Sequence, residues 1–273
     1  MTGNLDAANR LLMKFDTLIR EERASHWEGP LKVGVDLGTA NIVIAVVDQD
    51  DNPVAGIMKS SKVVRDGIVV DYIGAIEAVR EMKHILECRL GCELRNAAAA
   101  IPPGVLEGSV KSIANVVEGA GFDVGAIADE PTAASKVLNI AEGAVVDVGG
   151  GTTGISILKN GRVIFTGDEP TGGTHMTLVL AGACRCSTEE AEAIKTDAGR
   201  DGAVFPVIRP VVDKMASIVK NYLEGYEVDK IYVVGGACCF NDFERAFEKS
   251  IGIKTLKPAL PLLVTPLGIA MNG

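Results

Sequence analysis

The sequence has few aromatic residues, and it has no apolar run long enough to cross a bilayer. Aromatics make up only 4% of the 273 residues, whereas a membrane helix needs about 20 consecutive apolar residues. Proteins that bind single-stranded nucleic acid stack bases on aromatic rings and carry positive charge to meet phosphates. This chain has a net charge of -9. We therefore expect neither a nucleic-acid partner nor a membrane span.

The chain also lacks the cysteine spacing of a redox or zinc motif. It has six cysteines, and none forms a C-x-x-C pair. They are Cys88, Cys92, Cys184, Cys186, Cys238 and Cys239. The N-terminus is polar and amphipathic rather than basic and then apolar, so it does not look like a secretory signal. We expect a cytoplasmic protein with reduced thiols. Hydrophobic residues make up 47% of the chain, enough to build a large core.

The most informative stretch is residues 145–158, VVDVGGGTTGISIL. Two apolar strands flank Asp147, three glycines and two threonines, a pattern typical of strand, tight turn and strand. Consecutive glycines let the backbone approach a ligand closely, and their N–H groups form a concave anion site. Asp147 can hold a magnesium ion directly or through water. The stretch predicts a nucleotide phosphate site. Taken alone, it is equally compatible with a hairpin that has no chemical role.

Residues 33–48, VGVDLGTANIVIAVVD, repeat this pattern with Asp36, Gly38, Thr39 and Asn41. An internal repeat carries architectural information, because one strand pair cannot bury both of its faces alone. We expect two similar halves whose turns face each other across a cleft. A phosphate chain in that cleft would then be held from both sides.

The remaining pattern predicts an amphipathic helix over 5–24 ahead of two lobes. The expected division is a helical segment at 1–29, a first lobe at 30–143 with a small subdomain at 51–92, and a second lobe at 144–273 with a small subdomain at 176–226. The last helix of the chain is expected to pack on the first lobe. The helix over 5–24 either packs on its own lobe, the reading we favour, or docks onto a partner. Further helices are predicted over 74–91 and 206–225, and Ser187 with Glu190 forms a capping box.

Five motifs occur in order along the chain: DLGTAN at 36–41, DEPTAA at 129–134, DVGGGTTG at 147–154, VVGGA at 233–237 and TPLGIAM at 265–271. Together they resemble the actin-like ATPase superfamily of actin, DnaK-type chaperones, sugar kinases, MreB and FtsA, over essentially residues 31–273. VGVDLGTANIV and the segment VRDGIVVDY (64–72) most resemble the EutJ family of ethanolamine-utilization proteins, encoded with bacterial microcompartment genes. The resemblance implies an α/β, duplicated actin-like (ribonuclease H-like) fold with two lobes around a nucleotide cleft.

The resemblance also implies roles for individual residues. Asp36 and Asp147 would hold a hydrated magnesium ion, and Glu130 would position the attacking water, so these three form the expected catalytic set. The implied nucleotide contacts are Gly38, Thr39, Asn41, Gly149, Gly150, Gly151, Thr152, Thr153, Gly172, Gly173, Glu192, Lys195, Gly235, Gly236 and Ala237. Among them, Glu192 and Lys195 equally fit an exposed charge pair on a helix. The implied cofactors are ATP and magnesium. The phosphate-side lysine of DnaK-type chaperones has no clear match, and Lys59 and Lys62 are the candidates.

The favoured function is that of a slow, magnesium-dependent ATPase with a chaperone-like role. It would assist assembly or reactivation of a microcompartment enzyme or shell protein, with the helix over 5–24 as a candidate docking element. One alternative is an iron–sulfur activator ATPase, which would need thiolates such as Cys184 and Cys186 to meet between two subunits. Another is a nucleotide-binding scaffold or filament with little turnover. A small-molecule kinase ranks last, because the chain shows no motif for the aspartate base that such enzymes need.

Overall fold

The computed structural model describes residues 5–65, 67–104 and 107–273, and it contains two five-stranded sheets of matching topology. The first sheet runs β3 (Pro53–Ser60), β2 (Asn41–Val47), β1 (Lys32–Leu37), β6 (Asn96–Ile101) and β7 (Asp123–Asp129). The second runs β10 (Arg162–Glu169), β9 (Thr153–Lys159), β8 (Gly143–Val148), β11 (Lys230–Val234) and β12 (Lys254–Leu256). In each sheet three antiparallel strands are followed by two that add in parallel. The matching orders confirm the internal duplication.

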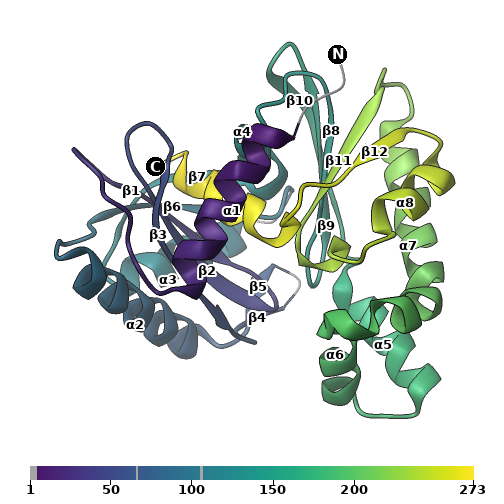
Figure 1. Cartoon of the computed structure of the whole chain (residues 1–273), viewed down its shortest axis with the longest axis horizontal. Helices are drawn as coiled ribbons and strands as arrows, with labels where there is room; N and C mark the ends of the chain where they lie inside the picture. The colour runs from purple at the N-terminus through teal and green to yellow at the C-terminus, as the bar shows by residue number, and fades with distance from the viewer. Residues whose placement is uncertain (1–4, 66, 105–106) are drawn as a thin grey trace.

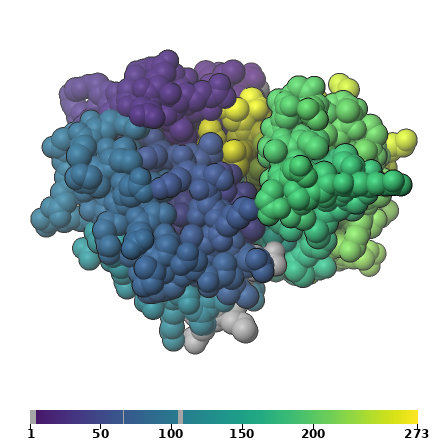
Figure 2. All heavy atoms as spheres, turned by 90° about the horizontal axis from the view of Figure 1, so that it is seen from below, coloured from purple at the N-terminus to yellow at the C-terminus, as the bar shows by residue number. Residues whose placement is uncertain are grey.

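Helices cover both sheets on both faces. They are α1 (Asp6–Arg20), α2 (Tyr72–Leu90), α3 (Glu107–Gly119), α4 (Glu130–Leu138), α5 (Gly173–Cys184), α6 (Thr188–Thr196), α7 (Asp201–Leu223), α8 (Phe243–Ile251) and α9 (Val264–Ala270). A two-stranded ribbon of β4 (Val64–Arg65) and β5 (Ile68–Val69) precedes α2. Figure 1 shows the two sheets side by side, with α2 and α3 beside the first and α5 to α8 beside the second. Figure 2 shows the yellow C-terminal segment between the blue first half and the green second half. Among the described helices, none combines the length and apolarity that a membrane crossing requires.

The central strands read as continuous apolar runs because both of their faces are buried. In β2, Ile42 and Ile44 pack towards α2 and α3, whereas the alternating residues Val43 and Ala45 pack towards α1, α4 and α9. Side chains alternate between the two faces of a strand, so one strand serves two cores. The strands of the second sheet divide in the same way between an outer core with α5, α7 and α8 and the shared inner core.

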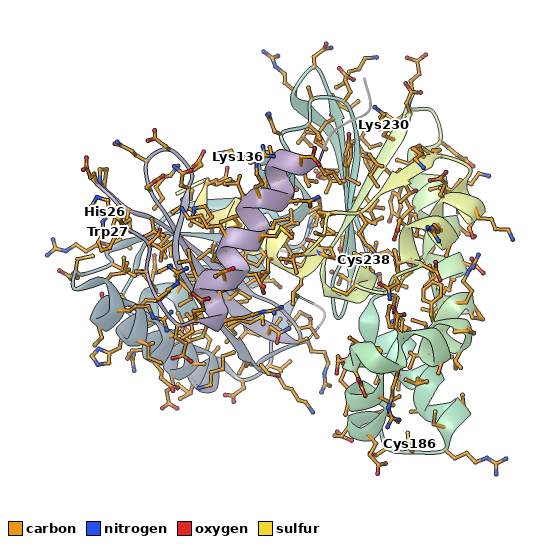
Figure 3. The ribbon with its side chains drawn as sticks, viewed as in Figure 1. His26, Trp27, Lys136, Cys186, Lys230 and Cys238 are labelled. Atoms are coloured by element: carbon orange, nitrogen blue, oxygen red, sulfur yellow. The ribbon has the colours of Figure 1, made fainter. Side chains whose placement is uncertain are left out.

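Two short helices cross between the halves. Helix α4 follows the first sheet but packs on β8 and β9, and α9 follows the second sheet but packs on β1, β2 and β6. The helices meet at Gly268, where a Cβ atom would lie 2.1 Å from the carbonyl oxygen of Ala133. The Nζ of Lys136 (Figure 3) adds a hydrogen bond of 3.3 Å to the Met271 carbonyl. The two halves are therefore joined by direct contact of helix backbones.

The N-terminal helix packs on its own chain. Its apolar face, formed by Ala8, Leu12, Phe15 and Leu18, is buried, and the Phe15 ring fills the space that a side chain at Gly56 of β3 would need. This face is covered by the chain itself, as the favoured interpretation of the helix expects. Docking of the helix onto a partner stays a prediction. The helix ends at Arg20 rather than at residue 24. Two acidic residues follow there, and negative charge is unfavourable at a helix C-terminus.

The other predicted helices lie close to their expected bounds. Helix α2 starts two residues earlier than predicted because Asp71 caps it, and it ends before Gly91, which adopts the left-handed conformation at φ 69°. Helix α7 is the exception, because it starts at Asp201, five residues before the predicted start, and carries Pro206 and Pro210 within it. The Ser187 and Glu190 capping box is confirmed. In the VRDGIVVDY segment, Asp66 lies outside the described residues.

The contact between α4 and α9 predicts the effect of adding one methyl group. Gly268→Ala should lower the free energy of unfolding by about 1–3 kcal/mol, because the new Cβ overlaps the Ala133 carbonyl and the helices must separate. Gly182→Ala on α5 is the matched control, because open space surrounds that position. It should be neutral or stabilise by up to about 1 kcal/mol. Urea denaturation of both variants measures the difference, and equal stabilities would contradict the role of Gly268.

Candidate functional site

The two glycine-containing turns lie against each other at the line where the halves meet. Asp36 is the penultimate residue of β1 and Asp147 that of β8, and these strands occupy the same place in the two sheets. A Cβ atom at Gly150 would lie 3.1 Å from the Cβ of Thr39. Gly38 and Asn41 close the first turn, where a Cβ at Gly38 would meet the Asn41 carbonyl at 2.9 Å. The structure therefore brings the two repeated motifs together.

The start of α5 holds the Gly149–Gly151 loop through backbone hydrogen bonds. The N–H groups of Gly173 and Thr174 donate to the carbonyls of Gly149 at 2.9 Å and Gly150 at 2.8 Å. A trans peptide is planar, so the N–H that follows each carbonyl points the opposite way, away from α5. A Cβ at Gly172 would lie 2.7 Å from the Gly150 carbonyl oxygen, so only glycine fits under the loop. The loop can therefore present peptide N–H groups to an anion.

Carboxyl groups gather beside this loop with raised pKa values. Burial, and then the neighbouring Asp147 charge, raise the pKa of Asp36 to about 7. Burial raises the pKa of Asp147 to about 6, against a hydrogen bond from the Thr265 hydroxyl that favours its charged form. Two close carboxylates away from bulk water repel each other. The pair is therefore suited to a cation, and oxygen ligands suit magnesium.

Glu130 reaches the same place from α4. Asp129 caps the helix by accepting hydrogen bonds from the Thr132 N–H at 3.0 Å and from the Ser156 hydroxyl of β9 at 3.1 Å. This fixes the helix start over the second half. Burial, followed by the charges of Asp147 and Asp36, raises the pKa of Glu130 well above its ordinary value. All three carboxylates of the expected catalytic set therefore lie within electrostatic reach of one another.

The glycines after β11 lie between Asp147 and α5. Gly235 has φ 92°, and a Cβ there would lie 2.3 Å from an Asp147 oxygen, so the position requires glycine. Gly236 begins the short turn that follows, and the Ala237 Cβ would lie 3.2 Å from a Cβ at Gly173. The close contacts at Gly235 and Gly173 are therefore with atoms of the protein itself.

Glu192 and Lys195 brace α6 against α5. The Nζ of Lys195 donates to the Gly173 carbonyl at 3.0 Å, to the Thr177 hydroxyl at 2.7 Å and to the Glu192 carboxylate at 2.7 Å. The Lys195 side chain is only 10% exposed, whereas that of Glu192 is 44% exposed. The pair is thus more than an exposed helix pair, and it lies beside the glycines that support the loop.

Three residues that were candidates for contacts with the nucleotide have protein partners in the structure. The hydroxyl of Thr153 donates to the Thr171 carbonyl at 2.5 Å, so it faces the protein. The Nζ of Lys59 pairs with Glu81 at 2.6 Å. The Nζ of Lys62 lies 3.8 Å from Glu189 on α6, an exposed contact between the two halves. Both candidate lysines thus have surface carboxylate partners in this structure.

Sequence reasoning missed two residues of this site, Asp168 and Thr265. Burial raises the pKa of Asp168 to about 7, opposed by a hydrogen bond from Thr152. The tetrapeptide DEPT occurs at both 129–132 and 168–171, but Asp168 corresponds there to the capping Asp129 and not to Glu130, so the repeat did not indicate its role. Thr265 lies in the TPLGIAM motif, but its contact with Asp147 depends on how α9 crosses the halves.

The fit of a magnesium ion rests on these oxygen donors. Among residues 5–65, 67–104 and 107–273, no three His, Cys, Asp or Glu side chains are placed to ligate a metal by themselves. Magnesium commonly keeps several water ligands and takes only one or two carboxylates. Asp36 and Asp147 would hold it in that way.

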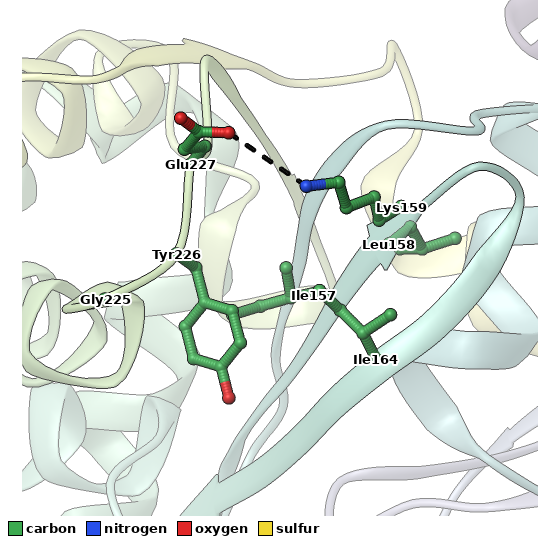
Figure 4. A pocket seen from close by; sticks show the side chains of 7 residues that line it. All are labelled: Ile157, Leu158, Lys159, Ile164, Gly225, Tyr226 and Glu227. Atoms are coloured by element: carbon green, nitrogen blue, oxygen red, sulfur yellow. Dashed lines mark ion pairs between the residues drawn. The ribbon is translucent and has the colours of Figure 1, made fainter.

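The cysteines do not gather at the site. Cys184 and Cys186 lie at the end of α5, and Cys238 is buried with its thiol donating to the Gly235 carbonyl at 3.2 Å. Figure 3 shows Cys186 and Cys238 in different parts of the second half. A surface pocket lies elsewhere, between the β9–β10 hairpin and the loop after α7 (Figure 4), and Lys159 and Glu227 lie 4.0 Å apart at its edge.

Comparison with known proteins gives consistent results. A family model described as cell division protein FtsA matches residues 144–250. Ethanolamine utilization protein EutJ of Escherichia coli (strain K12) is 42% identical over 90% of this chain and 87% of that protein. The crystal structure of EutJ from Carboxydothermus hydrogenoformans matches with a TM-score of 0.92 and 48% identity, covering 97% of this chain and 98% of that one. MreB 5 of Spiroplasma citri bound to AMPPNP matches with a TM-score of 0.71 and 18% identity, covering 89% and 95%. The expected duplicated, actin-like α/β fold is confirmed.

The raised pKa values predict how stability depends on pH without ligand. The pKa values of Asp36, Asp147 and Asp168 are raised to about 7, 6 and 7 in the folded protein, well above the ordinary range of an aspartate. The folded state then binds more protons than the unfolded chain between about pH 4 and 7, so stability should fall as the pH rises through that window. Thermal unfolding should occur at a lower temperature at pH 8 than at pH 5.

The variant Asp36→Asn removes one of these groups and should flatten the profile. The exposed Asp229→Asn is the control and should leave the profile unchanged. A wild-type melting temperature that stays constant from pH 5 to 8 would contradict the clustering of these carboxyl groups.

Proposed function

Because the chain belongs to the EutJ family of ethanolamine-utilization proteins, we propose that it binds magnesium–ATP between its two halves and hydrolyses it slowly. The observation that carries this proposal is the contact of the two repeated turns beside carboxylates from both halves. Thr39 and Gly150 lie against each other, and Asp36, Asp147 and Glu130, which lie near these turns in the chain or in α4, act electrostatically on one another. The nucleotide-bound MreB relative, although distant, has the same fold.

Each part of the site has a task in phosphoryl transfer. A bound magnesium ion supplies charge neutralisation for the phosphates. Asp36 and Asp147 hold its water ligands, and the Thr265 hydroxyl keeps Asp147 oriented. The peptide N–H groups of Gly150 and Gly151 bind phosphate oxygens, while the Gly149 N–H closes the turn on the Thr152 carbonyl at 2.9 Å. Glu130 accepts a hydrogen bond from the attacking water and orients it.

The nucleoside end of ATP lies towards α5 and α6 in this proposal. Gly235, Gly236 and Ala237 form one wall there, and Lys195 holds α6 in place through Gly173. Glu192 is fixed through the same lysine and is exposed enough to contact a ligand. These residues bind and position the nucleotide and do not take part in the chemistry.

Nucleotide binding also has a mechanical consequence. The ligand would contact both halves, and helices α4 and α9 also join the two halves directly. A change in phosphate content changes the contacts on both sides at once, and the helices transmit that change across the molecule. We propose that this movement supports a chaperone-like role, aiding assembly or reactivation of an enzyme or shell protein of a bacterial microcompartment in the cytoplasm. The partner would bind an outer surface, because the apolar face of α1 is buried.

Two variants separate nucleotide binding from turnover. Asp147→Asn removes the charge that holds the metal, and its magnesium–ATP affinity should fall about 10- to 100-fold, the worth of one hydrogen bond to a charged group. Glu130→Gln keeps the metal site but loses the group that orients water. Its turnover should fall at least about 100-fold with nearly unchanged affinity. Calorimetry measures binding, and phosphate release measures turnover.

Asp229→Asn on the exposed start of the same sheet is the control and should behave like the wild-type protein. If wild-type protein shows no magnesium-dependent ATP binding, the proposed function fails. If wild-type protein binds ATP but Glu130→Gln turns it over at the wild-type rate, Glu130 is not the water-positioning group. Binding without any turnover favours the nucleotide-dependent scaffold.

The partner should depend on the nucleotide state. Tagged Glu130→Gln protein holds ATP and should retain more of a microcompartment enzyme or shell protein than Asp147→Asn does, from cells grown on ethanolamine. Quantitative mass spectrometry of the two captures, with wild-type protein alongside, measures the ratio. Equal recovery of these proteins by both variants would argue against a nucleotide-driven role in microcompartment assembly.

A further inference from the structure

Asp168 lies on the edge strand β10, directly opposite Gly154 of β9. Residues that oppose each other in an antiparallel pair place their side chains on the same face. A Cβ at Gly154 would point at Pro103 and Pro131, at 3.1 Å and 3.2 Å from their ring atoms. Asp168 therefore faces the first half, next to the start of α4 where Glu130 lies.

Glycine at 154 leaves this space open. Any larger residue there would fill the region between the β9–β10 hairpin and Pro131, because a Cβ alone already makes tight contacts. Asp168 extends into the same region from the neighbouring strand. The charge of Asp168 acts on Glu130, and that of Asp147 acts on Asp168, so the three carboxyl groups are neighbours across the interface.

One oxygen of Asp168 has no protein partner. Its Oδ1 is buried and accepts no hydrogen bond, although the Thr152 side chain and the Glu169 N–H interact with the carboxyl group and favour its charged form. Buried polar atoms in folded proteins nearly always have a partner, and an orphan atom points to a water or ion. The charged groups that act on Asp168 are Asp147 and Glu169, both acidic. A cation beside Asp168, or a water molecule bound to a cation, would therefore be favourable.

We propose that Asp168 is a further positioning residue of the magnesium–nucleotide site. Its free Oδ1 accepts a hydrogen bond from a water in the hydration shell of the magnesium ion, between Asp147 and Glu130. Thr152 holds the carboxyl group in place from the phosphate loop, so the residue couples the loop to the metal. The inference rests on the proposed binding of magnesium–ATP and adds a carboxylate from the β10 edge to it.

Asp168→Asn tests this role through the magnesium requirement. The magnesium concentration that gives half of the ATP-dependent rise in melting temperature should increase about tenfold, as expected for one lost charge-assisted hydrogen bond. ATP affinity in EDTA should stay within about twofold of wild type. The melting temperature without ligand should stay the same or rise, because a buried charge among like charges is removed.

Asp229→Asn is the matched control, since it makes the same change at an exposed aspartate that does not act on Asp168. It should keep the wild-type magnesium requirement. A wild-type requirement in Asp168→Asn, or a lower ligand-free melting temperature as its only change, would overturn the role of Asp168. If wild-type protein shows no magnesium-dependent ATP stabilisation at all, the proposed function fails first. The two failures are therefore distinguishable.

Discussion

The contact between α4 and α9 is the constraint on which the rest of the structure depends. Gly268 lets the two helices approach backbone to backbone, and a Cβ atom there would overlap the Ala133 carbonyl. Each helix begins beside a proline, at Glu130-Pro131 in α4 and at Thr265-Pro266 in α9. Through this crossing α4 carries Glu130 to the second half, and α9 carries Thr265 to Asp147. The duplicated halves thus acquire an asymmetric site, with a carboxylate from one crossing helix and a hydroxyl from the other.

The electrostatics of that site follow from the packing. Strands β1 and β8 are central in their sheets, so aspartates near their ends are shielded from water, and each raises the cost of ionising its neighbours. Natural proteins accept such destabilisation at functional sites and offset it elsewhere. Here the apolar cores of two sheets and the inner core shared by α1, α4 and α9 provide the stability. A cation and an anion bound together would relieve the repulsion and meet the loop N–H groups.

Family membership and fold do not by themselves say what this chain acts on. The actin-like fold hosts chaperones, kinases and filament proteins, so the fold alone does not select among them. The site is built from both halves and the connection between them is tight, which suits small movements that are shared by the whole molecule. The burial of α1 on β3 makes the N-terminal helix part of this body, and its apolar face stabilises the inner core.

How much could be predicted from the sequence varies with the range of the interaction. The strands around Asp36 and Asp147, their glycine turns and the capping box at Ser187 could be predicted, because they follow from local periodicity and from a repeat within the chain. Asp168, Thr265 and the reason for Gly235 could not. Each depends on atoms brought together by the sheet register or the crossing helices, such as the Asp147 and Thr265 pair separated by 118 positions. Local patterns determine strands and turns, because their hydrogen bonds and side-chain periods are short-range. Only the tertiary structure decided which buried carboxylates meet and which helix face remains free.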